Sequence, residues 1–334
     1  MQNNIDPYAK PLVELNTHPI EIGDYYLATN EINKLYTYVS KWIRNRIPGA
    51  VIYGYPRVGK TKAISYVIKI LQEELGDDFP IHHVSCRTRK NPTENFFFED
   101  LLFGIRHDLA LVGSKPNLKR KRLLNALIEQ AEVANSNKVI LFLDDAQNLF
   151  ELEYRWLMDL YNDLALQNIH LITFLVGQLE LMYQRTAYRD SGKYQLVGRF
   201  MSQDYEFKGL QDADDIEICL SGYDEFSEYP IKSGWSYTRF YFPEAFSQGF
   251  RLGHLAPDIW DTIQSIRRKN HIKNNLDIPM QYFVLFIENI LLQYGSDSVN
   301  KEYDIHHIKK EQMEETLIGT GYVEWETHGR KFQA

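Results

Sequence analysis

Residues 50–61 read Ala-Val-Ile-Tyr-Gly-Tyr-Pro-Arg-Val-Gly-Lys-Thr, an apolar run followed by a glycine-bounded turn. The apolar run predicts a buried strand, and residues 60–75 predict a helix that Gly76 closes. Between them the pattern G-x-x-x-x-G-K-[ST] is matched in full by Gly54, Tyr55, Pro56, Arg57, Val58, Gly59, Lys60 and Thr61. A loop of this kind turns its backbone N–H groups toward phosphate groups at the start of a helix. The stretch therefore predicts a phosphate-binding loop rather than a chance glycine turn.

A second acidic motif supports nucleotide chemistry at the same place. Lys60 is predicted to reach the β- and γ-phosphates of ATP, and Thr61 to hold Mg²⁺. Residues 138–145 read Lys-Val-Ile-Leu-Phe-Leu-Asp-Asp, a buried strand that delivers acids at its carboxyl end. We expect Asp144 to lie on the metal side and Asp145 to orient or deprotonate the attacking water. The alternative is that these two residues only cap a following helix.

The rest of the chain predicts an α/β fold followed by a helical region. Further strands are expected at 81–84, 169–176 and 205–207, and strands that alternate with helices indicate a parallel sheet flanked by helices. After residue 209 the sequence becomes helical and aromatic. The predicted organisation is an N-terminal arm over 1–28, broken by Pro7, Pro11 and Pro19, a nucleotide-binding core over 29–209, a smaller helical lid over 210–320, and a C-terminal tail over 321–334.

Composition narrows the class of protein. The chain has 44% hydrophobic and 25% charged residues, which is ordinary for a soluble globular protein. No apolar run is long enough to cross a membrane, and residues 1–10 lack the apolar segment of a signal peptide. The two cysteines, Cys86 and Cys219, are far apart in the sequence, so we expect no disulfide scaffold. This cysteine content fits a reducing cytoplasm best. The formal net charge of -8 disfavours bulk affinity for nucleic acid but allows a local basic patch.

The chain resembles a known family at three places. The loop 54–61, the run Asp144-Asp145-Ala146-Gln147 and the run Gly198-Arg199-Phe200 are similar to AAA+ ATPases. Within that group the order of elements over residues 20–210 looks most like the transposition regulators of the TnsC/TniB type. The resemblance implies an ATP hydrolase with an AAA+ core and a helical lid. Such a protein uses ATP and Mg²⁺, forms a ring or filament on duplex DNA, and links a target-selection protein to a transposase.

One departure from the family concerns the catalytic acid. The family usually carries Asp-Glu at the end of this strand, whereas this chain carries Asp144-Asp145. The side chain of Asp145 is one methylene shorter than that of glutamate, so it holds water less well. We therefore expect slow hydrolysis, or reliance on the neighbouring subunit.

The resemblance also implies roles for two further residues. Gln178 lies just past the fourth strand, where the family places a side chain that senses the γ-phosphate; Thr173 is the alternative. Arg199 matches the arginine finger that the family supplies across a subunit interface, with Arg185 and Arg189 as nearby competitors. A lid arginine is implied too, and its candidates are Arg251, Arg267 and Arg268.

Two basic clusters are the predicted DNA-binding residues. They fall in the region that in the family faces a central pore, where contacts to phosphates read no sequence. Their members are Arg87, Arg89 and Lys90 in the first cluster, and Lys119, Arg120, Lys121 and Arg122 in the second. The alternative is a solvated charged face. The aromatic run 235–242 fits a base-stacking platform, a partner-docking surface or lid core, and His82, His83 and Cys86 lack zinc-site spacing.

Two other functions compete with the transposition hypothesis. Residues 144–147 and 195–199 faintly resemble helicase motifs, but a second motor domain does not fit after residue 209. A signalling or defence ATPase that acts through protein contacts alone is the other alternative. Strand separation on a forked duplex distinguishes the first, and DNA binding in the presence of ATP distinguishes the second.

Overall fold

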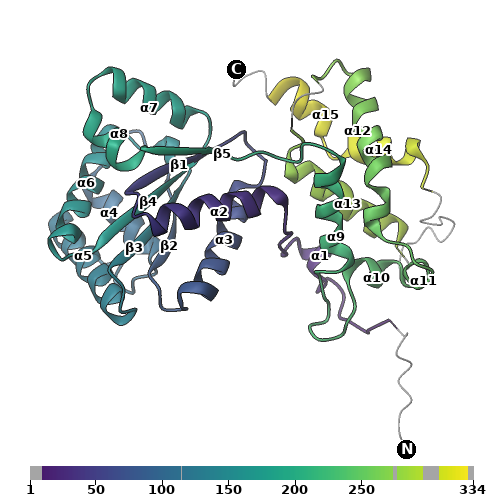
Figure 1. Cartoon of the computed structure of the whole chain (residues 1–334), viewed down its shortest axis with the longest axis horizontal. Coiled ribbons are helices and arrows are strands. Elements are labelled where there is room, and N and C mark those ends of the chain that lie inside the picture. Colours follow the sequence, from purple (N-terminus) through teal and green to yellow (C-terminus); the bar gives the residue numbers. More distant parts are fainter. Residues whose placement is uncertain (1–9, 114, 274–276, 296–307, 330–334) are drawn as a thin grey trace, which may run out of the picture. The chain divides into compact units, whose positions relative to one another are not determined.

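The computed structural model describes residues 10–113, 115–273, 277–295 and 308–329 (Figure 1). The chain forms two compact units. The first unit is Ile32–Lys208, and the second combines the segment before residue 32 with the segment that begins at Gly209. Pro7, with the other residues of 1–9, and residues 330–334 of the predicted tail lie outside the described residues.

The first unit is built on a parallel five-stranded sheet of order β2-β3-β4-β1-β5. Each pair of neighbouring strands is parallel, which confirms the predicted sheet. The runs predicted as buried strands form its centre, because strands covered on both faces read as continuous apolar sequence. The strands are β1 (Gly49–Tyr53), β2 (Ile81–Ser85), β3 (Lys138–Asp144), β4 (His170–Gly177) and β5 (Gln203–Glu206).

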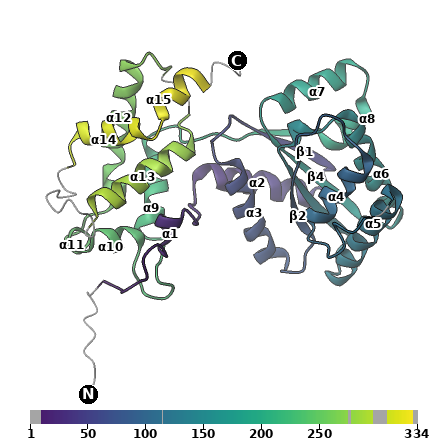
Figure 2. The same ribbon diagram turned by 180° about the vertical axis from the view of Figure 1, so that it is seen from behind.

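Helices cover both faces of this sheet (Figure 1). One face packs against α2 (Asn30–Arg44) and α3 (Lys60–Leu75). The other face packs against α4 (Glu94–Gly104), α5 (Pro116–Val133) and α6 (Glu151–Leu166), which Figure 2 shows from behind. Residues of β3 alternate between the two cores: Ile140 and Phe142 join the first, while Leu141 and Leu143 join the second. Two more helices, α7 (Glu180–Asp190) and α8 (Tyr194–Phe200), precede β5.

The second unit is helical, as the sequence predicts. Its longer helices are α9 (Ala213–Asp224), α12 (Ala256–Lys269), α13 (Met280–Tyr294) and α14 (Lys310–Gly319). Shorter elements are α1 (Pro19–Ile22), α10 (Tyr237–Tyr241), α11 (Pro243–Ser247), α15 (Tyr322–Glu324), a 3₁₀ turn at Leu252–Leu255 and a π-helical turn at Trp325–Gly329. The aromatic run is core: Trp235, Tyr237, Phe240, Tyr241 and Phe242 are all buried, which excludes a base-stacking platform.

The described part of the N-terminal arm packs within this helical unit. Pro19 begins α1 instead of preventing a helix, because proline is tolerated in the first turn. His18, which precedes it, is fully buried among four aromatic rings whose centroids lie between 4.5 and 5.0 Å from its own. The rings belong to Tyr229, Tyr237, Phe240 and Tyr241. The Nδ1 atom of His18 accepts a hydrogen bond of 3.1 Å from the N–H of Ile20.

Burial of His18 predicts that acid destabilises the helical unit. Burial and, secondarily, the positive charge of Lys10 lower the pKa of His18 from 6.5 to about 4. The unfolded chain therefore takes up this proton near its ordinary pKa, while the folded chain does not until about pH 4. We expect His18 to account for about 2 kcal/mol of lost unfolding free energy between pH 7 and pH 5.

The measurement is urea unfolding of the wild type and of His18→Gln at pH 7 and pH 5. The variant should lose less stability than the wild type over this interval, whatever its stability at pH 7. Equal losses in the two proteins would show that His18 does not carry this dependence.

Candidate nucleotide site

The phosphate loop joins the end of β1 to the start of α3, and its backbone requires two glycines. A Cβ atom on Gly54 would collide with the carbonyl oxygen of Phe207, whose N–H donates a 2.7 Å hydrogen bond to the carbonyl of Tyr53. Gly59 has φ +99°, a left-handed conformation that favours glycine. Arg57 is also left-handed, with φ +67°. The loop therefore adopts a tight turn whose last residue leads directly into the helix.

Lys60 lies across this loop. Its Nζ donates hydrogen bonds of 2.9 Å to the carbonyl of Gly54 and 2.8 Å to the carbonyl of Tyr55. Both of these acceptors are neutral carbonyl oxygens. Phosphate oxygens are charged and make stronger hydrogen bonds with an ammonium than carbonyl oxygens do, so a bound nucleotide can draw it away.

The two sequence motifs meet at Thr61 and Asp144. Oγ1 of Thr61 donates a 2.7 Å hydrogen bond to Oδ2 of Asp144, across 83 residues of sequence. Nε2 of His83, on β2, lies 3.3 Å from the same oxygen, and the N–H of Asp145 donates a 2.9 Å hydrogen bond to Oδ1. Burial opposes the ionisation of Asp144, but the hydrogen bonds from His83, Thr61 and Asp145 outweigh it and lower its pKa.

These donors fit a magnesium ion. Mg²⁺ prefers oxygen ligands and is usually held by one or two protein groups together with the phosphates of its substrate. Asp144 supplies an ionised carboxylate, and Thr61 supplies a hydroxyl beside it. Among the described residues no group of three His, Cys, Asp or Glu side chains could hold a metal by itself. The donor pair of Asp144 and Thr61 matches the one or two protein groups that hold Mg²⁺ beside the phosphates of a nucleotide.

Asp145 lies next to this carboxylate with its side chain exposed. Its backbone is left-handed, with φ +53°, and its Oδ1 accepts a 3.1 Å hydrogen bond from the amide of Gln147. Oε1 of Gln147 in turn accepts a 3.2 Å hydrogen bond from the N–H of Gln178. Gln147 therefore links the predicted catalytic acid to the tip of β4. Thr173 is fully buried in the middle of that strand, so it cannot sense a phosphate and leaves Gln178 as the predicted sensor.

Two contacts around this site could not be predicted from the sequence. In the sequence His83 is one residue of a predicted strand, and Gln147 follows the two acids with no signal of its own. His83 reaches Asp144 because β2 and β3 pair in parallel, with Ser85 opposite Asp144. Gln147 lies against Gly177, where an added Cβ atom would collide with Oε1 of Gln147. Only the strand register reveals either contact.

Arg199 lies on α8, directly before β5. Its Cζ atom is 4.2 Å from the ring centroid of Tyr161 on α6. Its competitors are engaged differently: Arg185 forms a 2.6 Å ion pair with Asp204, and Arg189 lies 3.4 Å from the neighbouring Asp190. A role for Arg199 across a subunit interface stays a prediction.

The three candidate lid arginines differ in access to solvent. Arg267 is fully buried, donates a 2.7 Å hydrogen bond to the hydroxyl of Tyr322 and lies 3.9 Å from Glu326, so it stabilises the helical unit and cannot reach a nucleotide. Arg251 lies over the ring of Phe246 at 3.6 Å. Arg268 is exposed.

The second basic cluster is not one surface, which corrects the expectation from its sequence. Successive residues of a helix point about 100° apart, because a turn holds 3.6 residues. Lys119 is 1% exposed and paired with Glu99, so it is excluded from binding DNA. Arg120 pairs with Asp159 and Asp163, and Arg122 donates to the carbonyl of Leu109, while Lys121 is exposed.

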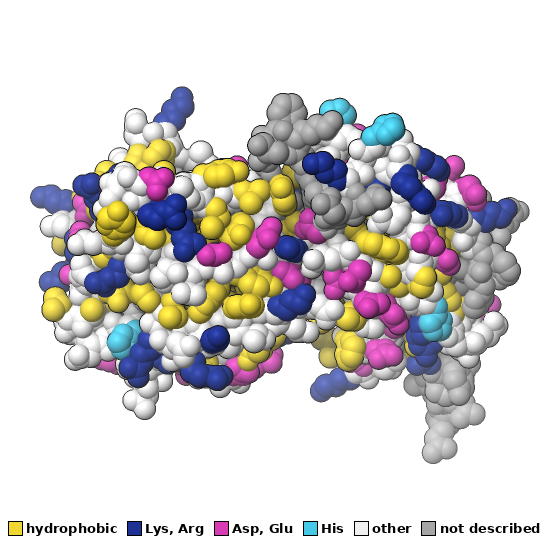
Figure 3. Space-filling model, turned by 45° about the horizontal axis from the view of Figure 1, so that its top comes forward, with side chains coloured by type: hydrophobic (Ala, Val, Ile, Leu, Met, Phe, Trp, Pro, Cys, Tyr) yellow, Lys and Arg dark blue, Asp and Glu magenta, His cyan; other side chains and the backbone are white. Residues whose placement is uncertain are grey.

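The first cluster is also partly neutralised. Arg89 forms a 2.5 Å ion pair with Asp100, and Arg87 lies 3.8 Å from the same carboxylate. Lys90 is exposed. On the face that Figure 3 shows, Lys and Arg side chains are interspersed with acidic and apolar ones instead of forming one basic patch. Of the two clusters, Lys90 and Lys121 are exposed and have no ion pair with the residues that the structure describes.

Comparisons with known proteins identify the fold of this site. A family model described as an AAA domain matches residues 48–183. The ORC2 protein of Aeropyrum pernix in its ADPNP–ADP complexes is similar in structure, with a TM-score of 0.59, 9% sequence identity, and coverage of 91% of this chain and 71% of that chain. Its ADP form gives a TM-score of 0.55 and 10% identity, with coverage of 93% and 71%. No curated protein matches the sequence.

These findings confirm the predicted AAA+ fold with its phosphate loop. They do not specifically support the TnsC/TniB type. Within the described residues, no helix is both long and apolar enough to cross a membrane.

Proposed function

We propose that this chain is an ATP-dependent regulator of DNA transposition, which oligomerises on duplex DNA and couples a target-selection protein to a transposase. The observation that carries the ATP chemistry is the hydrogen bond between Thr61 and Asp144, because it brings the phosphate loop and the strand-end acid to one point. The choice of transposition rests on the sequence resemblance at residues 54–61, 144–147 and 198–200.

Binding of ATP would rearrange the loop around the phosphates. The ammonium of Lys60 leaves the carbonyls of Gly54 and Tyr55 for the β- and γ-phosphates, and the loop N–H groups contact their oxygens. Thr61 and Asp144 would hold Mg²⁺, which neutralises charge on the phosphates when it is bound. The carboxylate of Asp145 orients a water molecule for attack on the γ-phosphorus and accepts its proton as the bond to ADP breaks.

Slow turnover follows from the geometry around Asp145. The side chain is short, and its hydrogen bond to Gln147 must be shared with or exchanged for the attacking water. The side-chain amide of Gln147 also accepts the hydrogen bond from the N–H of Gln178. When a γ-phosphate reaches Gln178, this amide would move and release the carboxylate of Asp145 from its hydrogen bond. Such a site suits a switch that rests in its ATP state.

Assembly would be the output of this switch. Arg199 projects from α8 onto the outer layer formed by α6, where a neighbouring subunit could receive it. Contact between this arginine and the γ-phosphate would support the oligomer, and loss of that phosphate would weaken it.

DNA binding is expected to depend on this assembly. With a net charge of -8, one subunit should bind duplex DNA poorly. The exposed cations Arg87, Lys90 and Lys121 recur in every added subunit, so an oligomer gains avidity along the DNA backbone. Contacts to phosphates release counterions, and the affinity should therefore fall steeply as the salt concentration rises.

The test is duplex DNA binding in a mobility-shift assay, with a non-hydrolysable ATP analogue and with ADP, on two unrelated sequences. We expect similar affinity for both sequences with the analogue and at least about tenfold weaker binding with ADP. Absence of binding with the analogue at low salt would contradict the proposal and favour an ATPase that acts through protein contacts. Binding to one sequence alone would contradict the phosphate-tracking mechanism.

A further inference from the structure

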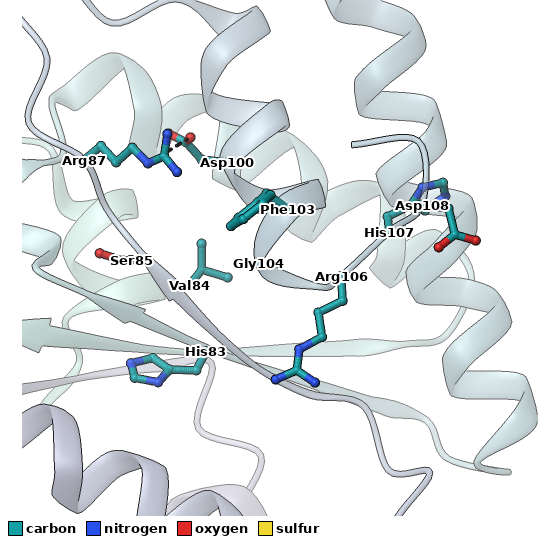
Figure 4. A pocket seen from close by; sticks show the side chains of 10 residues that line it. All are labelled: His83, Val84, Ser85, Arg87, Asp100, Phe103, Gly104, Arg106, His107 and Asp108. Atoms are coloured by element: carbon teal, nitrogen blue, oxygen red, sulfur yellow. Dashed lines mark ion pairs between the residues drawn. The ribbon is translucent and has the colours of Figure 1, made fainter. Parts of the chain in front are cut away.

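A pocket of about 520 Å³ lies beside β2, at the edge of the described sheet, between the last residues of the strand and the turn that follows α4 (Figure 4). Its volume falls within the roughly 300–1,000 Å³ of small-molecule sites. Ser85 and Arg87 form the side of the pocket nearest the carboxyl ends of the strands, where the phosphate loop and Asp144 lie. The turn 106–108 forms the opposite side and also lines a neighbouring hollow with Asp78, which precedes β2. His83 is one of the lining residues, and its Nε2 lies 3.3 Å from Oδ2 of Asp144, so one residue of β2 borders the pocket and contacts the nucleotide site.

Helix α4 and the turn after it shape this pocket. Gly104 allows α4 to pack closely on β2, because a Cβ atom there would collide with the side chain of Val84. The helix ends at Gly104, and Arg106 then adopts a left-handed conformation with φ +57°. In Figure 4 this turn directs the side chain of Arg106 toward the strand side of the pocket, where His83 lies.

The lining carries two arginines and two aspartates, and the arrangement of these charges leaves Arg106 as the cation available to an anion. Arg106 is exposed, and its guanidinium group makes no hydrogen bond or ion pair with any residue that the structure describes. Of the two acids in the lining, Asp100 is already shared by Arg89 at 2.5 Å and Arg87 at 3.8 Å. The carboxylate of Asp108 points away from Arg106 in Figure 4.

Two further side chains of the lining can donate hydrogen bonds to an anion. Nδ1 of His107 accepts a 3.0 Å hydrogen bond from the N–H of Leu109, which in the neutral ring places the hydrogen on Nε2. Arg87 lies 5.8 Å from the ring centroid of Phe103, beside Asp100, and is thereby restrained at the pocket's rim. A planar guanidinium and a ring N–H are well suited to the oxygens of a phosphate group.

We propose that this pocket binds a phosphate group, with Arg106 as its principal ligand, and that the backbone of duplex DNA supplies that phosphate. The inference deepens the proposed function and rests on it for the source of the phosphate. It assigns the contact to a residue outside both basic clusters of the sequence. The exposed ring of Phe103 adds an apolar surface for the adjoining sugar.

The experiment compares Arg106→Gln with Arg46→Gln. Arg46 is a matched control: it is exposed, it follows the end of a helix, and its φ of +54° is also left-handed. Each variant loses one positive charge at a residue with a left-handed backbone. In the presence of a non-hydrolysable ATP analogue, Arg106→Gln should bind duplex DNA about tenfold more weakly, as expected for one charge-assisted hydrogen bond. The slope of the logarithm of the DNA-binding constant against the logarithm of the salt concentration should become less steep by about 0.9 per bound subunit. Arg46→Gln should match the wild type in both affinity and slope.

A second arm uses inorganic phosphate, with sodium chloride at equal ionic strength as its control, and records the thermal unfolding midpoint of each protein. Loss of DNA affinity in Arg106→Gln assigns the pocket to the DNA backbone. If DNA affinity is unchanged but the phosphate-induced rise in the midpoint is lost, the pocket takes free phosphate. If Arg106→Gln equals Arg46→Gln in both arms, the inference is overturned. If the wild type binds no DNA, the proposed function fails, while the phosphate arm still decides the pocket.

Discussion

Replacing Lys60 with alanine is expected to lower the affinity for ATP by about 100-fold or more. An ammonium on a phosphate oxygen is a charge-assisted contact of about 1.5–3 kcal/mol, and Lys60 is predicted to contact two phosphates. Alanine leaves the backbone of the loop intact, because Gly54 and Gly59 determine its turn. The loss should therefore appear in binding, with little change in folding.

The measurement is calorimetric titration with ATP and Mg²⁺. Lys69→Ala is the control, because Lys69 is an exposed lysine on the same helix, α3. The control should bind as the wild type does. Affinity within about threefold of the wild type in Lys60→Ala would mean that the loop does not hold the phosphates as its motif predicts.

The second large effect is expected for Arg199→Ala. Arginine fingers in related ATPases and GTPases raise turnover by roughly 10³–10⁵, and the short Asp145 places this protein at the lower end of that range. We expect a fall of about 1,000-fold in hydrolysis with ATP affinity within a few-fold of the wild type. The substitution also removes the cation–π interaction between Arg199 and the ring of Tyr161, which is worth about 0.5–1 kcal/mol and is too weak for its removal to unfold the unit.

Single-turnover phosphate release at saturating ATP measures this effect. Arg189→Ala is the matched control, since Arg189 is an exposed arginine on the preceding helix. If Arg189→Ala lost activity and Arg199→Ala retained it, the finger would be assigned to the wrong helix.

The fold could be predicted from sequence where structure is local and periodic. Continuous apolar runs identified β1, β3 and β4. The segment before residue 32 belongs to the same compact unit as the segment from Gly209, a long-range association that no local pattern shows. Helix α4 was not predicted, because its sequence Glu-Asn-Phe-Phe-Phe-Glu-Asp-Leu-Leu-Phe-Gly has apolar residues on most sides and no clear stripe.

The parts of the site that could be predicted are those formed by residues adjacent in the sequence. The loop 54–61 and Asp144 could be read directly, and their contact through Thr61 agrees with the predicted pairing. The contacts of His83 and Gln147 depend on which strands are neighbours, which no local pattern shows.

The positions of exposed, unpaired cations were the hardest feature to predict from the sequence. Four consecutive basic residues on α5 suggested one patch, but the turn of the helix directs Lys119 into the core and Arg120 onto acids of α6. Arg106 is exposed and forms no ion pair with the residues that the structure describes, and the sequence analysis did not single it out because no lysine or other arginine lies next to it.

The proposed mechanism requires that the ATP site containing Lys60 of one subunit is completed by Arg199 of the next subunit. The direct measurement is ATP hydrolysis by a mixture of Lys60→Ala and Arg199→Ala proteins, each inactive alone. In a mixed head-to-tail oligomer, about one quarter of the interfaces pair an intact Lys60 with an intact Arg199. We predict that equal amounts of the two proteins recover a comparable fraction of wild-type turnover when assembled on duplex DNA. A mixture no more active than its separate components would contradict a shared site.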